Sequence, residues 1–114
     1  LHMHPELAWE EVRTAGRIAE LARAAGLDVR EGIAKTGVVA VLHGGATSPE
    51  TGRRTILIRA DMDALPIHEA TAGRPHASTI PGRMHACGHD GHVAMAITAA
   101  HVLARGRDKP NPGQ

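Results

Sequence analysis

Side chains that can do chemistry are concentrated in one short segment, His85-Ala86-Cys87-Gly88-His89-Asp90-Gly91-His92. This segment holds three of the nine histidines and the only cysteine of the chain. Its cysteine and middle histidine lie two residues apart in a glycine-containing turn that leads into an apolar helix. The positive end of a helix dipole favours a thiolate, and a thiolate and an imidazole at such a turn can ligate a transition metal.

Spacing alone leaves three interpretations of Cys87 open. A lone cysteine is most often an ordinary small buried residue. It can also be a nucleophile paired with a histidine base, or a metal ligand. A structural site of the zinc-finger type does not suit the segment, because such sites usually contain two to four cysteines.

A second pair of candidate groups, Asp61 and Asp63, follows a predicted strand. In α/β proteins ligands gather at the carboxyl ends of strands. Paired carboxylates there can bind a metal, orient a metal-bound histidine or act in acid/base chemistry. They can equally be solvated loop acids or turn formers. Together with Cys87 and His89 at a helix entry, they favour a metal site more than either feature does alone.

Two elements must position these groups. Residues 55–60, Thr-Ile-Leu-Ile-Arg-Ala, form an apolar run that predicts a buried strand leading directly into Asp61. After the histidine-rich segment, apolar residues from Val93 to Ala104 recur at three- and four-residue spacing. This pattern predicts an apolar helix that ends near Gly106.

The rest of the chain completes an α/β pattern. The spacing of apolar residues predicts a helix over residues 6–25, with acidic residues at the positive end of its dipole. Strands are predicted at residues 27–31 and, as a buried strand, at 37–43. Residues 44–52 and 73–83 are rich in Gly and Pro and predict loops. The order predicts a layered α/β fold in which the last helix packs on the sheet.

Composition excludes several classes of function. The 114 residues suit one domain with a modest core, and 13 Lys+Arg against 12 Asp+Glu leave a net charge of +1. This balance gives no reason to expect nucleic acid or a membrane as partner, and no apolar run is long enough to span a membrane. The lone cysteine fits a reducing, cytoplasmic location. By their number, several histidines are expected to be exposed, among them His2, His43 and His101.

Three segments of the chain resemble the M20 peptidase family, in its branch of amidohydrolases that cleave N-acyl amino acids. This branch includes hippurate hydrolases, N-acetylamino acid deacetylases and auxin-conjugate hydrolases. The segments are LHMHPELAWEE at residues 1–11, RADMDALPIHE at 59–69 and PGRMHACGHDGH at 81–92. They occur in the family's order, the likeness covers nearly the whole chain, and the second and third segments are highly specific.

The resemblance implies roles for individual residues. Cys87 resembles the thiolate ligand shared by two metal ions, and His89 resembles a ligand of one of them. Asp63 matches the catalytic-site acid that orients a ligand histidine. The position of that histidine falls on Asp61, which is therefore a further candidate ligand. Supporting roles, by hydrogen bonding or packing, are expected for His85, Asp90 and His92.

The resemblance also implies an activity, hydrolysis of the amide bond of N-acyl amino acids. Two divalent ions, such as manganese, zinc, cobalt or nickel, activate the water in this chemistry. Residues 1–114 would form the N-terminal part of a zinc-exopeptidase-like α/β/α catalytic domain, holding about half of the metal site. The general-base glutamate, the later ligands and the dimerisation domain are expected outside this chain. The parent is expected to be a homodimer or larger, and both ends look like cuts in a longer protein.

Two alternatives stay open beside this interpretation. One is another M20 branch, a dipeptidase or a carboxypeptidase, although those enzymes carry Asp at the position of Cys87. The other is a truncated, non-catalytic metal-binding or structural module. The ligand types do not select one metal, because cysteine and histidine suit several first-row ions.

Overall fold

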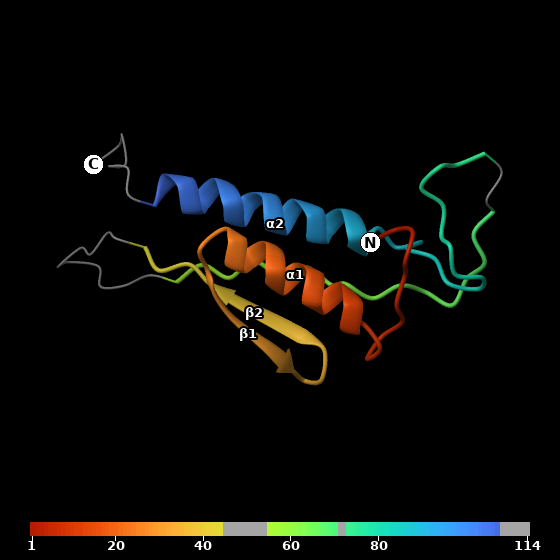
Figure 1. The fold of residues 1–114 in the computed structure, drawn as a ribbon, viewed down its shortest axis with the longest axis horizontal. Coiled ribbons are helices and arrows are strands. Elements are labelled where there is room, and N and C mark those ends of the chain that lie inside the picture. The colour runs from red at the N-terminus through yellow and green to blue at the C-terminus, as the bar shows by residue number, and fades with distance from the viewer. Residues whose placement is uncertain (45–54, 71–72, 108–114) are drawn as a thin grey trace.

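Two helices and one β-hairpin make up the fold of the described residues (Figure 1). A computed structural model describes residues 1–44, 55–70 and 73–107. The elements are, in chain order, α1 (Val12–Ala24), β1 (Asp28–Ile33), β2 (Gly37–Val41) and α2 (His89–Gly106). Among the described residues, no helix combines the length and the apolar character needed to cross a membrane.

Helix α1 lies at the centre of the arrangement. It contacts both strands on one side and α2 on the other, so that the molecule is layered (Figure 1). Its buried residues Ala15, Ala19 and Ala22 recur at three- and four-residue spacing, as the sequence predicts. The core is built from small side chains, to which Ala64 and Val93 also contribute.

The predicted start of the first helix at residue 6 is wrong, because α1 begins at Val12. Glu6 lies outside the helix and caps it from there. Its carboxylate accepts hydrogen bonds from the backbone N–H groups of Arg13, at 3.0 Å, and Thr14, at 2.7 Å. These amides have no partner within a first helical turn, so an acid is favourable there even though it is not a helical residue.

The two strands predicted near residues 27–31 and 37–43 are confirmed as an antiparallel hairpin. Asp28 pairs with Val41 and Arg30 with Val39, and an irregularity follows between Arg30 and Ile33. The second strand is not buried as predicted, because Val39 and Val41 are exposed. The hairpin uses one face against α1 and leaves the other face uncovered by described residues.

The prediction of a buried strand at residues 55–60 is wrong. These residues form no strand, and Ile56 and Leu57 are each 87 % exposed. A strand needs a hydrogen-bonded neighbour, and none of the described residues pairs with this segment. The apolar run therefore has the composition of a central strand without the neighbours of one.

The last helix is confirmed, and it begins at His89, one turn before the predicted apolar positions. The expectation that it packs on the sheet is wrong for the described residues, where α2 contacts α1 and neither strand of the hairpin. Residues 73–83 form turns, as predicted. The loop predicted at 44–52 lies, beyond Gly44, outside the described residues.

The cap at Glu6 leads to a prediction about stability. Burial acts to raise the pKa of Glu6, but its hydrogen bonds from Thr14 and Arg13 outweigh burial and hold the pKa below the usual 4.5. Glu6→Gln should lower the free energy of unfolding by about 1 kcal/mol at neutral pH, a typical cost of a lost cap. Urea denaturation of the purified chain measures this.

A matched control is Glu20→Gln on the exposed surface of α1, where the carboxylate pairs with Arg17. That change should cost less than about 0.5 kcal/mol. A carboxyl with a lowered pKa stabilises the fold above its usual pKa and loses this effect as the pH falls through the lowered value. The Glu6→Gln deficit should therefore shrink in acid. A deficit that is equal for both variants at neutral pH would show that Glu6 is not a cap.

Candidate functional site

The histidine-rich segment forms the turn that leads into α2. Gly88 adopts a left-handed conformation, with φ of 84°, directly before the helix. Cys87 is an exposed free thiol, and His89 is the half-buried first residue of α2. The two candidate ligands thus lie two residues apart at the positive end of a helix, as the sequence predicts.

The structure brings Asp63 and His89 together. The Nδ1 of His89 lies 2.9 Å from Oδ1 of Asp63 and 3.0 Å from its main-chain oxygen. Both oxygens are acceptors, so Nδ1 carries the proton. Every hydrogen bond recorded for His89 in the described part of the chain uses Nδ1, which leaves Nε2 for another partner. A histidine that binds a metal through one nitrogen commonly donates the other N–H to a carboxylate in this way.

Backbone pairing on both sides fixes the position of Asp63. The next residue, Ala64, is 3 % exposed and donates its N–H to the carbonyl of Glu6 at 2.7 Å. Leu65 then exchanges two backbone hydrogen bonds with Met84, at 2.9 and 3.0 Å. Asp63 is therefore held between the N-terminal segment and the strand-like stretch that runs into Cys87.

The side chain of Asp61 has a different partner from that of Asp63. Its carboxylate pairs with Arg59, two residues earlier, at 3.2 Å through one of its oxygens. Among the described residues, no hydrogen bond or ion pair joins Asp61 to Cys87 or His89. Its assignment as a further candidate ligand stays a prediction.

The three supporting residues have different surroundings. Asp90, in the first turn of α2, accepts a hydrogen bond from His2 at 2.7 Å. The ring of His92 lies 6.4 Å from that of His89, centroid to centroid. His85 is buried, and neither of its ring nitrogens has a partner among the described residues. Burial holds the pKa of His85 below its usual value of 6.5, which favours the neutral imidazole.

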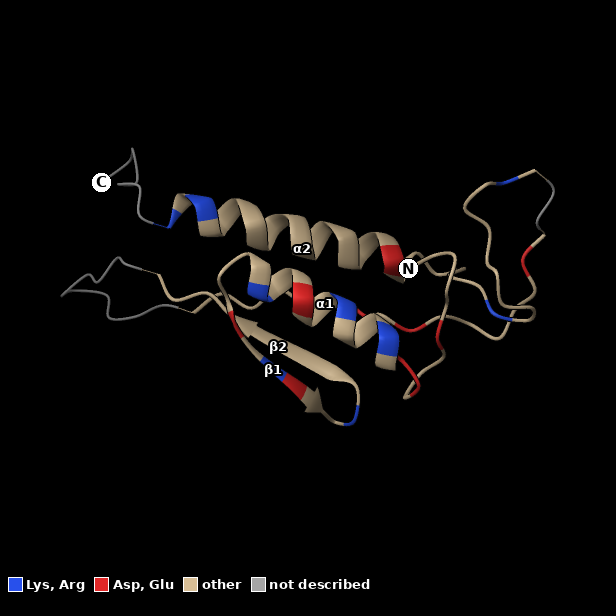
Figure 2. Cartoon of the chain, viewed as in Figure 1, with Lys and Arg blue, Asp and Glu red and all other residues tan. Residues whose placement is uncertain are grey.

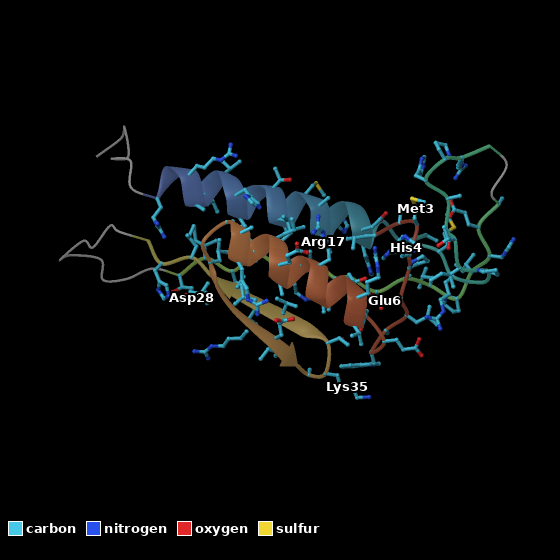
Figure 3. All side chains as sticks on the ribbon, viewed as in Figure 1. Met3, His4, Glu6, Arg17, Asp28 and Lys35 are labelled. Atoms are coloured by element: carbon cyan, nitrogen blue, oxygen red, sulfur yellow. The ribbon has the colours of Figure 1, made fainter. Side chains whose placement is uncertain are left out.

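Sequence reasoning missed the part played by the N-terminal segment. His2 was expected to be exposed, but it is half-buried and faces both Asp90 and Glu69. Thr79 donates both its N–H and its hydroxyl to the carbonyl of Met3, at 2.8 and 2.6 Å. Figure 3 shows Met3 and His4 between the start of α2 and the loop that contains these partners. The only signal for this was the resemblance of residues 1–11 to a family segment.

The donor set fits part of a metal site. A thiolate and an imidazole whose second nitrogen is fixed by a carboxylate suit zinc and other first-row ions. Within residues 1–44, 55–70 and 73–107, however, no three His, Cys, Asp or Glu side chains are gathered so that they could hold a metal ion. The arrangement supplies two candidate donors and an acid that contacts one of them. The expectation of about half a site stays a prediction.

Comparison with protein families gives one match over half of the chain. Residues 57–113 match the model of peptidase family M20/M25/M40. The matched residues include both Asp61 and Asp63 and the whole histidine-rich segment. They also include the helix α2 that follows it.

Several curated proteins are similar over nearly the whole chain. A probable hydrolase of Synechocystis sp. is 48 % identical over 92 % of this chain. A thermostable carboxypeptidase 2 of Saccharolobus solfataricus is 40 % identical over 95 %, and a hippurate hydrolase of Campylobacter jejuni is 44 % identical over 91 %. The chain spans about a quarter of the length of these relatives, 25, 26 and 26 % respectively.

A solved structure shares the fold. The Bacillus subtilis YXEP protein, described as a dinuclear metal-binding peptidase from the M20 family, superposes with a TM-score of 0.82 at 42 % identity. The match covers 94 % of this chain and 28 % of that protein. The predicted α/β class is confirmed by this likeness, and the two helices and the hairpin correspond to a portion of the larger domain.

The contact between Asp63 and His89 leads to a prediction about metal affinity. In the full-length protein, Asp63→Ala should weaken Mn²⁺ binding about tenfold, because His89 loses the carboxylate that fixes its ring. The lower end of the usual range is expected, since the main-chain oxygen of Asp63 remains within reach of Nδ1. Isothermal titration of the metal-free protein measures the change.

The chain offers a matched control in a second His–Asp pair. His43 and Asp28 are joined at 2.8 Å on the exposed hairpin. Asp28→Ala should leave Mn²⁺ affinity unchanged. If both alanine variants bind the ion as the parent does, Asp63 has no orienting role.

Proposed function

This chain belongs to peptidase family M20/M25/M40, and from that premise we propose that its full-length protein is a metal-dependent hydrolase of the amide bond in N-acyl amino acids. The observation that carries the proposal is the hydrogen bond between Asp63 and His89. It fixes the imidazole with Nε2 free, in the same turn as the free thiol of Cys87.

In this proposal Cys87 and His89 are ligands of a site for two divalent ions, with manganese, zinc, cobalt or nickel as candidates. Such ions, when bound, polarise an acyl carbonyl and lower the pKa of water. Asp63 holds the His89 ring through Nδ1, which would leave Nε2 to bind an ion. Asp61 is a further candidate ligand. The remaining ligands and the general-base glutamate are proposed to come from the part of the protein that this chain does not span.

The proposed substrates are small N-acyl amino acids such as hippurate or N-acetyl amino acids. Support comes from relatives named hippurate hydrolase and N-acetyl-L-cysteine deacetylase, each 44 % identical to this chain. The carboxypeptidase relative keeps a second candidate open, cleavage of a peptide at its C-terminal residue. Both activities would cleave an amide bond next to a C-terminal amino acid. They differ in the group on the other side of that bond, which is an acyl group in one case and a peptide in the other. A truncated, non-catalytic module is the remaining alternative.

We also propose a cytoplasmic location and a homodimeric or larger parent. The exposed thiol of Cys87 supports a reducing compartment, because only the reduced sulfur can be a metal ligand. The subunit assembly follows from the family resemblance alone. Size-exclusion chromatography with light scattering measures it directly.

A substrate panel tests the proposed activity. The full-length protein, stripped of metal and supplied with Mn²⁺, should hydrolyse hippurate or N-acetyl amino acids and not free dipeptides or longer peptides. Cys87→Ala and His89→Ala should each lose most of this hydrolysis, because each removes a metal ligand. His43→Ala, an exposed histidine on the hairpin, is the control and should be as active as the parent.

The outcomes of the panel separate the alternatives. Release of C-terminal residues from peptides, with no cleavage of acyl amino acids, would favour the carboxypeptidase. Metal binding without hydrolysis of any amide would favour the non-catalytic module. Full activity of both ligand variants would contradict the metal site itself.

A separate prediction concerns the 114-residue chain alone. It should show no significant turnover of N-acyl amino acids with added Mn²⁺. The described residues bring together fewer than three metal-binding side chains, and the expected general base lies elsewhere. Metal-dependent hydrolysis by the purified chain, abolished by a chelator, would contradict this expectation.

A further inference from the structure

A buried carboxylate lies beside the candidate metal site and has no role in the proposed chemistry. Glu69 is 2 % exposed and is among the largest fully buried side chains in the described part of the chain. Its Oε2 accepts the N–H of Ser78 at 2.6 Å, and its Oε1 faces the Nε2 of His2 at 3.3 Å. The hydrogen bond from the Ser78 amide, together with His2, holds the pKa of Glu69 below its usual value despite burial.

His2 connects this carboxylate to the start of α2. Its Nε2 faces Glu69, and its Nδ1 lies 2.7 Å from Oδ2 of Asp90. Ionised carboxylates only accept hydrogen bonds, so a ring that bonds both must carry a proton on each nitrogen. His2 is therefore an imidazolium between two anions, and the hydrogen bond to Asp90 raises its pKa further above the usual 6.5 than burial lowers it.

The start of α2 depends on such contacts because it has little local support. Gly88 precedes the helix in a left-handed conformation and, having no side chain, makes no cap hydrogen bond to the helix N-terminus. Two long-range contacts reach this turn instead. Asp63 contacts His89 from 26 residues away, and His2 contacts Asp90 from 88 residues away. Figure 2 shows the acidic first turn of α2 close to the N-terminus of the chain.

We propose that His2 is a positioning residue of the metal site. It links buried Glu69 to Asp90 and thereby fixes the turn that carries Cys87 and His89. This inference rests on the proposed function, since the turn must hold a metal for its position to matter. In this arrangement Glu69 is the anchor, because Ser78 and burial fix it independently of α2. Asp90 connects this link to the turn, because it directly follows the candidate ligand His89.

The two nitrogens of His2 can be separated by substitution. An asparagine amide nitrogen can take the place of Nδ1, and a glutamine amide nitrogen can take the place of Nε2. His2→Asn therefore keeps the bond to Asp90 and loses the one to Glu69. His2→Gln keeps the bond to Glu69 and loses the one to Asp90, so each variant breaks the link at a different end.

The experiment uses the full-length protein and titrates Mn²⁺ into the metal-free form. His2→Gln should weaken Mn²⁺ binding about tenfold or more, the usual effect of losing a contact that orients a ligand. His2→Asn, which loses the bond to Glu69, should also weaken Mn²⁺ binding, and His43→Ala should match the parent. Hippurate hydrolysis at saturating Mn²⁺ provides a second readout, in which kcat falls for His2→Gln while KM changes less.

A second variant keeps the test decisive if His2→Gln folds poorly. Asp90→Ala removes the same hydrogen bond from its other end and leaves His2 paired with Glu69. It should weaken Mn²⁺ binding as His2→Gln does. The double variant should lose little more than either single variant, because both changes remove one contact.

The contrary outcomes are distinct. If the His2 and Asp90 variants lose thermal stability but bind Mn²⁺ like the parent, His2 is a structural tie and the inference is overturned. Parent-like Mn²⁺ affinity of His2→Asn would show that the bond to Glu69 is not needed and would overturn the link. If the parent itself neither binds Mn²⁺ nor hydrolyses an N-acyl amino acid, the proposed function fails and takes this inference with it.

Discussion

The turn before α2 carries both candidate ligands and has little of its own to fix it. The residue before the helix is a left-handed glycine, which has no side chain to cap the first amides. Its position depends on the hydrogen bond from His89 to Asp63. That bond in turn depends on the backbone of residues 64 and 65, which pairs with the N-terminal segment on one side and with Met84 on the other. The geometry of the site is thus a tertiary property, assembled from segments far apart in the chain.

Carboxylates accept many of the hydrogen bonds that connect segments far apart in the chain. Glu6 accepts two amides of α1, buried Glu11 accepts the hydroxyl of Thr36 at 2.6 Å, and Asp63 accepts the His89 ring. Glu69 and Asp90 accept His2 from opposite sides. Each of these acids has a donor that is distant in sequence or outside its own element. Since a buried polar group without a partner is costly, such contacts discriminate strongly between the native arrangement and alternatives.

Local patterns in the sequence predicted the elements that carry their own determinants. The alanines of α1, the apolar repeat of α2 and the Val-rich run of the second strand of the hairpin are all visible along the chain, and each element is present. The strand at residues 55–60 could not be decided in this way. Its apolar run describes a central strand, but pairing is supplied by neighbours, and the described residues contain none for it. The start of α1 was misplaced because Glu6 satisfies helical amides from outside the helix.

The residues of the candidate site, like the elements of the fold, could be predicted only where the signal is local. Spacing pointed to Cys87 and His89, and resemblance pointed to Asp63 as the orienting acid, which the structure places against His89. Composition and spacing do not distinguish His2 from the exposed His43, since both histidines stand beside apolar residues. Only the fold shows that one meets two carboxylates and the other meets a single exposed acid. A contact made across 88 residues leaves no periodic signal in the chain.

The composition explains why polar contacts carry so much of the architecture. The chain has one Trp and no Phe or Tyr, and its buried apolar residues are four alanines and one valine among those described. Such small side chains bury little area, so they stabilise the fold weakly and specify it weakly. Directional hydrogen bonds accepted by Asp63, Glu69 and Asp90 add specificity that these small side chains lack. The proposed binding of an ion at Nε2 of His89 would therefore be thermodynamically linked to the association of the N-terminal segment, residues 61–69 and α2.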